Sequence, residues 1–171
     1  KDLDAISKLE SGEIPVNYDR FNLTDLIHEV IDSLELKAKK YNITLHFKEK
    51  YHSPTWVYAD REKIRQVLVN LIDNSFKYGK AGGNTSIKTF ELHDQILVEI
   101  TDDGIGIEEK YLPRLFERFY RTDKSRSRQI GGSGLGLAIV KHIIEAHQQT
   151  ITVRSTENIG STFGFTLQRD K

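Results

Sequence analysis

The sequence contains no cysteine. This absence excludes disulfide bonds, thiolate metal sites and cysteine nucleophiles, and it is compatible with a reducing cytoplasm. No apolar run approaches the length of a membrane-spanning helix, and the first residues, KDLDAISKLESG, are charged and helix-like, unlike a signal peptide. A net charge is also missing, since 25 Lys and Arg balance 25 Asp and Glu. We therefore expect a cytoplasmic protein or fragment with no general affinity for nucleic acid and no direct membrane contact.

The composition and the apolar pattern predict one folded domain. Its 171 residues are 37% hydrophobic and 29% charged, as in an ordinary soluble protein. Apolar residues at helical spacing predict helices at residues 22–41, at 60–79 and after the glycines of 131–136. Alternating or β-branched residues predict strands at residues 43–51, 55–59, 85–92, 95–103, 150–156 and 161–167. The segment 108–133 is charged and weakly periodic, which predicts a short helix followed by a mobile loop.

This order of elements predicts a two-layer α/β sandwich, in which a mixed sheet is covered on one face by three helices. Asn22 or Thr24 is expected to cap the first long helix, and Asp60 the second. The fold class alone assigns no function. The six histidines have no metal-ligand spacing and are interpreted as surface or helix-end residues. They are His28, His46, His52, His93, His142 and His147.

The stretch GGSGLGLAIVKHIIEAH, residues 131–147, places glycines directly before an apolar helix. Two interpretations are open. The glycines could form a flexible turn before a core helix. They could also form an anion site, because a bare backbone approaches a phosphate closely and the first N–H groups of the helix attract negative charge. The other polar motifs have to decide between these interpretations.

The stretch NLIDNSFKY places three polar side chains on one face of a predicted helix. Asn70 and Asn74 are four residues apart, and Lys77 follows on the same side. Carboxamide oxygens suit Mg²⁺, which keeps several waters and shares phosphate oxygens, and a lysine can neutralise those phosphates. The alternative is a solvated helix face without a ligand.

The stretch DDGIGI, residues 102–107, follows a predicted strand. Its glycines allow the chain to turn tightly against a flat ligand, and a buried carboxylate beside them can accept a hydrogen bond from an exocyclic amine such as that of adenine. The alternative is a plain acidic turn, and Asp103 is compatible with no more than that.

Together these stretches resemble the catalytic, ATP-binding domain of bacterial sensor histidine kinases, within the wider group of ATPases that includes gyrase, MutL and the Hsp90 chaperones. The residues RQVLVNLIDNSFKY look like the N box of that family, DDGIGI the first glycine box, LFERFYR the phenylalanine box, and GGSGLGLAIVKHIIEAH the second glycine box. The match covers residues 21–167 in the order of the family. It implies the Bergerat fold, a mixed five-stranded sheet under three helices, with ATP beneath a mobile lid.

The resemblance implies roles for the residues nearest the base and the metal. Asn74 would hold Mg²⁺ with help from Asn70, and Tyr78 would lie against the base. Asp102 would bind the adenine amine. The base pocket would be shaped by two glycines, Gly104 and Gly106.

The resemblance also implies a phosphate site. Lys77 would contact a phosphate, and the second glycine box would line the phosphates with Ser133, Gly134, Leu135 and Gly136. Two arginines are candidates near the γ-phosphate, Arg118 and Arg121, with Arg121 favoured. Two aromatic residues, Phe116 and Phe119, would be either lid anchors or core.

Asn70 occupies the position where the hydrolytic relatives have a glutamate as general base. A carboxamide cannot take a proton, so the resemblance implies transfer of the γ-phosphoryl group to a histidine and only weak ATP hydrolysis. The phosphoacceptor motif of the family, similar to HELRTPL, does not occur. Residues 1–14 are interpreted as the tail of the dimerisation and phosphoacceptor hairpin with its linker, and residues 15–171 as the catalytic domain.

The expected partners are the phosphoacceptor domain of the same kinase and a response regulator, and the expected cofactors are ATP and Mg²⁺. The fragment is expected to be a monomer, and its parent protein to be anchored in the inner membrane. Two alternatives remain: a nucleotide-binding module without kinase activity, and a serine kinase of the anti-sigma type. The chain departs from the family at 147–149, where His-Gln-Gln replaces His-Gly-Gly, so that the third helix is expected to end without a left-handed glycine cap.

Overall fold

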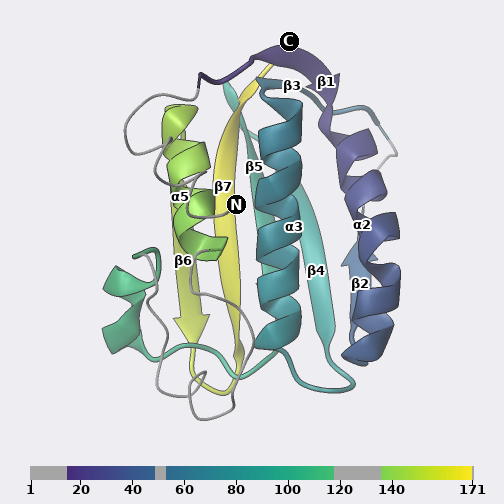
Figure 1. The fold of residues 1–171 in the computed structure, drawn as a ribbon, viewed down its shortest axis with the longest axis vertical. Helices are drawn as coiled ribbons and strands as arrows, with labels where there is room; N and C mark the ends of the chain where they lie inside the picture. The colour runs from purple at the N-terminus through teal and green to yellow at the C-terminus, as the bar shows by residue number, and fades with distance from the viewer. Residues whose placement is uncertain (1–14, 49–52, 118–135, 171) are drawn as a thin grey trace.

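The computed structural model describes residues 15–48, 53–117 and 136–170. Three α-helices of this part, α2, α3 and α5, lie side by side over one face of a sheet (Figure 1). The elements run in the order β1 (Asp19–Asn22), α2 (Leu23–Lys40), β2 (Thr44–Phe47), β3 (Trp56–Ala59), α3 (Arg61–Lys77), β4 (Asn84–Glu91), β5 (Gln95–Asp102), the 3-10 helix η1 (Glu109–Arg114), α5 (Gly136–Ala146), β6 (Ile151–Thr156) and β7 (Gly160–Arg169).

The sheet is mixed, as predicted. Its strand order is β1-β3-β7-β5-β4-β2, and β6 also pairs with β7. β2 pairs with β4 in parallel, and the other pairings are antiparallel. The two-layer fold class is therefore confirmed, but the described residues form seven strands where the family resemblance implied five. The strand missed by the sequence pattern is β1, because its four residues include one buried side chain, Phe21, and so show no alternation.

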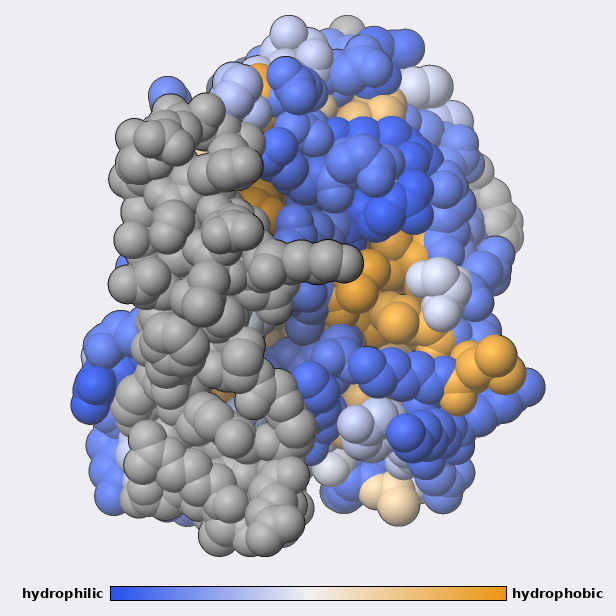
Figure 2. Space-filling view, in the orientation of Figure 1, coloured by the Kyte–Doolittle hydropathy of each residue, from blue (hydrophilic) through white to orange (hydrophobic). Residues whose placement is uncertain are grey.

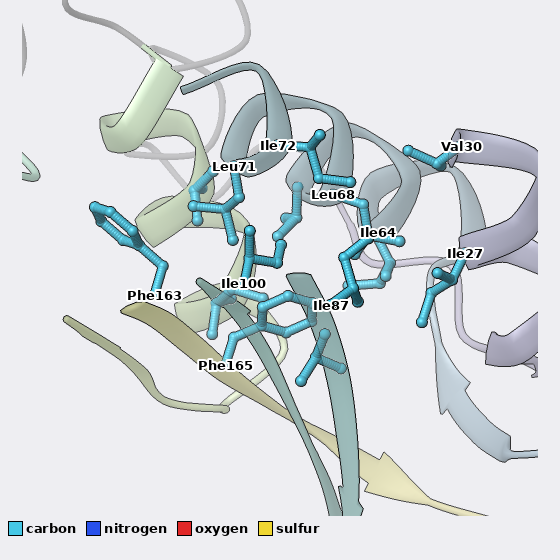
Figure 3. Packing of buried hydrophobic residues seen from close by; sticks show 14 of the residues in the cluster. Ile27, Val30, Ile64, Leu68, Leu71, Ile72, Ile87, Ile100, Phe163 and Phe165 are labelled. Atoms are coloured by element: carbon cyan, nitrogen blue, oxygen red, sulfur yellow. The ribbon is translucent and has the colours of Figure 1, made fainter. Parts of the chain in front are cut away.

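The core lies between the three helices and the sheet. Apolar side chains of α2 and α3 point at the sheet, and those of β4, β5 and β7 point back at the helices (Figure 3). The labelled members of this core are Ile27, Val30, Ile64, Leu68, Leu71, Ile72, Ile87, Ile100, Phe163 and Phe165. On the helical face of the molecule most visible residues are hydrophilic, with hydrophobic residues between them near α2 and α3 (Figure 2).

Side-chain caps set the start of both long helices. The side chain of Asn22 accepts hydrogen bonds from the backbone N–H groups of Thr24 and Thr55, at 3.1 and 2.9 Å. The carboxylate of Asp60 accepts from the N–H of Lys63 at 3.2 Å. The capping predictions for Asn22 and Asp60 are therefore confirmed, and the caps fix which residues of each helix face the core.

The end of α5 is formed without glycine. Gln148 adopts a left-handed φ of +58°, and the N–H groups of Gln148 and Gln149 donate to the carbonyls of Glu145 and Ile144 at 2.8 and 3.0 Å. This is the Schellman arrangement, formed here without glycine. The prediction that the helix ends without a glycine cap is therefore confirmed, and Gln148 takes the left-handed conformation in place of glycine.

His147 lies at the same helix end, one of the two places expected for the histidines, and at 4% exposure it is buried and not on the surface. Its Nε2 accepts a hydrogen bond from the N–H of Asp60 at 3.0 Å, and its Nδ1 donates to the carbonyl of Ile143 at 2.8 Å. Burial lowers the pKa of His147 and so favours the neutral ring that these two bonds require.

Two further predictions concern the ends of the described ranges. The short helix expected after residue 108 is the 3-10 helix η1. The loop expected after it, and the helical tail expected at residues 1–14, lie outside the described residues. Among the residues that the structure describes, no helix has the length and the apolar character needed to cross a membrane.

Candidate functional site

Asp102 is a buried carboxyl at the end of β5. The residue is 5% exposed, and its Oδ1 accepts a hydrogen bond from the N–H of Gly104 at 2.9 Å. Burial raises its pKa to about 6, and the negative charge of Asp103 acts in the same direction, whereas the N–H groups of Gly104 and Ser161 oppose the rise. At neutral pH the group is therefore an ionised carboxylate in a place that disfavours charge.

Gly104 and Gly106 are sites of close backbone approach. A Cβ atom on Gly104 would lie 2.0 Å from the carbonyl oxygen of Tyr78, and one on Gly106 would lie 2.1 Å from that of Thr156. Gly106 also has a left-handed φ of +68°. Neither position accepts a side chain without moving the loop, so these glycines have a packing role among the described residues in addition to any role towards a ligand.

Hydrogen bonds hold the same loop from two sides. The N–H of Ile105 donates to the carbonyl of Tyr78, directly after α3, at 3.0 Å. The N–H of Asn158, in the turn between β6 and β7, donates to the carbonyl of Ile105 at 2.7 Å. The position of the Asp102 carboxyl is therefore set jointly by the end of α3 and by the β6–β7 turn.

The polar stripe of α3 reaches the beginning of α5. The Nδ2 of Asn70 donates to the carbonyl of Gly136, the first residue of α5, in a long 3.4 Å hydrogen bond. Asn74 follows one turn later and is half-buried. Three of the four motifs thus meet at the carboxyl half of α3: the stripe itself, the DDGIGI loop through Tyr78, and the helical part of the second glycine box through Gly136.

The donor set of this stripe fits Mg²⁺. Because Asn70 uses its amide nitrogen on Gly136, its carbonyl oxygen remains for another partner. Asn74 offers a second neutral oxygen, and its side chain makes no hydrogen bond within the described part of the chain. A magnesium ion that keeps waters and phosphate oxygens as its other ligands needs only a small number of neutral oxygens from the protein.

Lys77, predicted to contact a phosphate, is engaged with a carboxylate in this structure. Its Nζ lies 3.0 Å from Oδ2 of Asp73, and Nζ of Lys37 from α2 lies 2.5 Å from Oδ1 of the same residue. Burial opposes the charge of Asp73, but the two nearby lysines, Lys37 and Lys77, outweigh it and lower the pKa of Asp73. Neither ion pair was predicted from the sequence, although the spacing of Asp73 and Lys77 is that of a helical ion pair.

Asp103 has a structural role within the part of the chain that the structure describes. Its two carboxylate oxygens accept from the backbone N–H and the side-chain Nδ2 of Asn84, at 2.8 and 3.0 Å. These bonds lower its pKa against the cost of burial. Asp103 therefore joins the DDGIGI loop to the start of β4.

Several predicted site residues lie outside the described residues, namely Arg118, Phe119, Arg121, Ser133, Gly134 and Leu135. Phe116 is described: its ring meets that of the core residue Phe163 edge-on, with 6.2 Å between centroids. Of the two roles considered for Phe116, this contact shows packing against the core.

A model of the histidine kinase-, DNA gyrase B- and HSP90-like ATPases matches residues 59–171. The chain is 36% identical over 168 residues to the sensor histidine kinase WalK of Bacillus subtilis, covering 97% of this chain and 27% of that protein. It is 40% identical over 174 residues to drug sensory protein A of Synechocystis, covering 95% of this chain and 26% of that protein. The chain thus spans about a quarter of the length of these curated relatives.

Solved structures show the same fold. The catalytic domain of the histidine kinase ThkA is similar with a TM-score of 0.78 and 31% identity, covering 90% of this chain and 96% of that one. The Acinetobacter baumannii histidine kinase AdeS has a TM-score of 0.78 at 28% identity, covering 99% of this chain and 76% of that one. A further similar structure, at 25% identity and a TM-score of 0.76, is ThkA in complex with the response regulator TrrA; it covers 98% of this chain and 47% of that one.

Proposed function

This chain belongs to the family of histidine kinase-, DNA gyrase B- and HSP90-like ATPases, and from that membership we propose that it is the ATP-binding catalytic domain of a sensor histidine kinase. In this proposal it transfers the γ-phosphoryl group of ATP to a histidine on a separate helical-hairpin domain. The observation that carries the proposal is the buried, ionisable Asp102, held by the glycine loop beside the polar stripe of α3.

Asp102 would bind adenine. A carboxylate that is 5% exposed is costly unless a donor reaches it, and the exocyclic amine of adenine is such a donor. Since the pKa of Asp102 is about 6, the carboxyl is ionised at neutral pH and can accept this bond. Guanine presents an oxygen at the same position of the ring, so the site would bind GTP poorly.

Asn74 and Asn70 would hold Mg²⁺, which when bound supplies charge neutralisation for the triphosphate. Lys77 would bind phosphate oxygens. The N-terminus of α5, beginning at Gly136, would bind these oxygens through its first backbone N–H groups. The residues outside the described ranges that we assign to the phosphates are Arg118, Arg121, Ser133, Gly134 and Leu135.

Asn70 also determines the reaction. Its carboxamide cannot take a proton from water, so the nucleophile has to bring its own basicity, as a histidine imidazole does. In the transfer, an imidazole nitrogen forms a bond to the γ-phosphorus while the bond from that phosphorus to the β,γ-bridging oxygen breaks, and ADP leaves. The role of this chain is to position ATP and to neutralise its charge.

The wider context is also a proposal. We propose that residues 15–171 form the catalytic domain, that residues 1–14 come from the phosphoacceptor hairpin, and that the whole protein acts in the cytoplasm on a response regulator. The complex of ThkA with a response regulator supports this assignment of a partner.

The test is a transfer reaction in trans. The chain is mixed with γ-labelled ATP, Mg²⁺ and the helical-hairpin domain of one of the similar sensor kinases. We expect label on the hairpin only when both proteins are present, and we expect it to be acid-labile, as phosphohistidine is. Acid-stable label would indicate a serine kinase instead. ATP binding without any transfer would indicate a nucleotide-binding module.

A further inference from the structure

We propose that Lys37 is a positioning residue for the phosphates of ATP: it holds Asp73 so that Lys77 can leave Asp73 and bind the triphosphate. This inference rests on the proposed function. It is carried by the charged side chains of Lys37 on α2 and of Asp73 and Lys77 on α3. Of these three residues, the sequence motifs contain Asp73 and Lys77 but not Lys37.

The geometry is that of one carboxylate between two ammonium groups. Lys77 lies 3.0 Å from Oδ2 of Asp73, and Lys37 lies 2.5 Å from Oδ1. The side chains of Asp73 and Lys77 are 19% and 23% exposed, whereas that of Lys37 is 43% exposed. Each oxygen of the carboxylate therefore has its own cation, and the two cations come from different helices, α2 and α3.

The two lysines differ in what they can reach. Lys77 lies on the same stripe of α3 as Asn70 and Asn74, and Asp73 lies on the flank of that stripe towards α2, where Lys37 contacts it. In this structure the ammonium of Lys77 is turned towards that flank. To contact a phosphate held by the asparagines, it has to exchange Asp73 for the phosphate.

The cost of this exchange depends on Lys37. When Lys77 departs, a carboxylate that is mostly buried keeps one cation if Lys37 is present and none if Lys37 is absent. Without Lys37, Lys77 is also held more strongly, because it is then the remaining partner of Asp73 within the described residues. Loss of Lys37 should therefore weaken binding of phosphates and leave binding of the base unchanged.

The first experiment compares Lys37→Gln with Lys40→Gln, a control that removes the same charge from the same last turn of α2. Each variant and the wild type are titrated with Mg-ATP and with adenosine. We expect Lys37→Gln to weaken ATP by about three- to tenfold relative to Lys40→Gln, with adenosine affinity equal in all three proteins. Equal ATP affinity in the two variants, or an equal loss for ATP and adenosine in Lys37→Gln, would overturn the proposal.

The second experiment removes the carboxylate. In Asp73→Asn there is no buried charge for Lys37 to compensate, and Lys77 is free to bind phosphate. We expect Asp73→Asn to bind ATP at least as tightly as the wild type, and the addition of Lys37→Gln to have no more effect than the addition of Lys40→Gln. An undiminished effect of Lys37→Gln in this background would show that it acts by another route.

These outcomes separate the inference from the proposed function. If the wild type binds ATP and Asp102→Asn impairs that binding, but Lys37→Gln equals its control, the function stands and the inference fails. If the wild type does not bind ATP, both fail together.

Discussion

Asp60 and Asp102 are equally buried aspartates, each 5% exposed, and their pKa values shift in opposite directions. Asp60 caps the start of α3. Asp102 lies beside the loop that packs on the end of the same helix. The difference between them lies in the hydrogen-bond donors and the charged neighbours that each carboxylate has within the protein.

The carboxylate of Asp60 is well supplied with donors. It accepts from the N–H groups of Asn17 and Lys63, at 3.0 and 3.2 Å, and from Nζ of Lys63 at 3.2 Å. Burial opposes its charge, but these bonds outweigh the burial and lower its pKa.

The carboxylate of Asp102 has two backbone donors, from Gly104 and Ser161, and a negative neighbour in Asp103. Here burial outweighs the hydrogen bonds, and the pKa rises to about 6. Asp60 is therefore a structural residue whose charge the protein satisfies, whereas Asp102 keeps a charge that the protein alone does not satisfy. A ligand that donates a hydrogen bond would complete it.

Replacement of Asp60, whose charge the protein satisfies, should have the largest effect on stability. Asp60→Ala removes a helix cap and the partners of Asn17 and Lys63, and we expect the free energy of unfolding to fall by about 2–4 kcal/mol. The pKa of Asp60 is lowered by folding, so this contribution is present above its unfolded pKa and is lost as the pH falls through the folded value. Denaturant titration measures the loss, with the exposed Asp32→Ala in α2 as control. A loss no larger than that of the control would show that Asp60 is not a structural charge.

Replacement of Asp102, whose charge the protein does not satisfy, should change the free energy of unfolding in the opposite direction. The pKa of Asp102 rises from 3.8 to about 6 on folding, so its ionisation opposes folding increasingly between those pH values and by a constant amount above them. Asp102→Asn, which keeps an oxygen for the Gly104 N–H, should raise the free energy of unfolding at pH 7 by about 1–3 kcal/mol.

The same denaturant titration at pH 4 provides the internal control for Asp102→Asn, because the wild-type carboxyl is then protonated when folded. The stability gain should be much smaller at this pH. A variant that is less stable than the wild type at pH 7 would contradict the account of Asp102.

Binding of the base should depend on pH through Asp102. Because the ionised carboxylate accepts the hydrogen bond of the amine more strongly than the protonated acid does, and its pKa is about 6, adenosine affinity should fall as the pH is lowered from 7 to 5. We expect a fall of about tenfold, in proportion to the ionised fraction. Adenosine is the right probe for an NMR titration, since it has no phosphate that titrates in this range. An affinity independent of pH would mean that Asp102 does not contact the base.

The smallest predicted effect concerns α5, whose last residues connect to Asp60 through His147. Gln148 holds a left-handed φ of +58°, a conformation that glycine adopts without steric cost. Gln148→Gly should raise the free energy of unfolding by about 1 kcal/mol, measured by denaturant titration, and should leave ATP affinity unchanged. The exposed Gln168→Gly in β7 is a control that should lower stability instead. A destabilising effect at 148 would mean that the Gln148 side chain makes a contact that outweighs the backbone strain.

The features that could be predicted from the sequence are those that neighbouring residues determine. The stripes and caps of α2 and α3 follow from local spacing, and the DDGIGI loop was recognised because its glycines adjoin Asp102 in the chain. The pairing of Lys37 with Asp73 was not predictable in this way, because it joins two helices through the tertiary fold. The burial of His147 was missed for the same reason, since its partner is the N–H of Asp60.

The central claim is that the charge left unsatisfied at Asp102 binds adenine. The most direct measurement is a calorimetric titration of wild type and Asp102→Asn with ATP and with GTP, each with Mg²⁺. We predict that the wild type prefers ATP, and that Asp102→Asn loses about 1.5–3 kcal/mol of ATP binding, because the Gly104 N–H holds the carboxamide oxygen and turns the NH₂ group towards the base. Equal binding of ATP and GTP by the wild type, or an unchanged preference in Asp102→Asn, would contradict the claim.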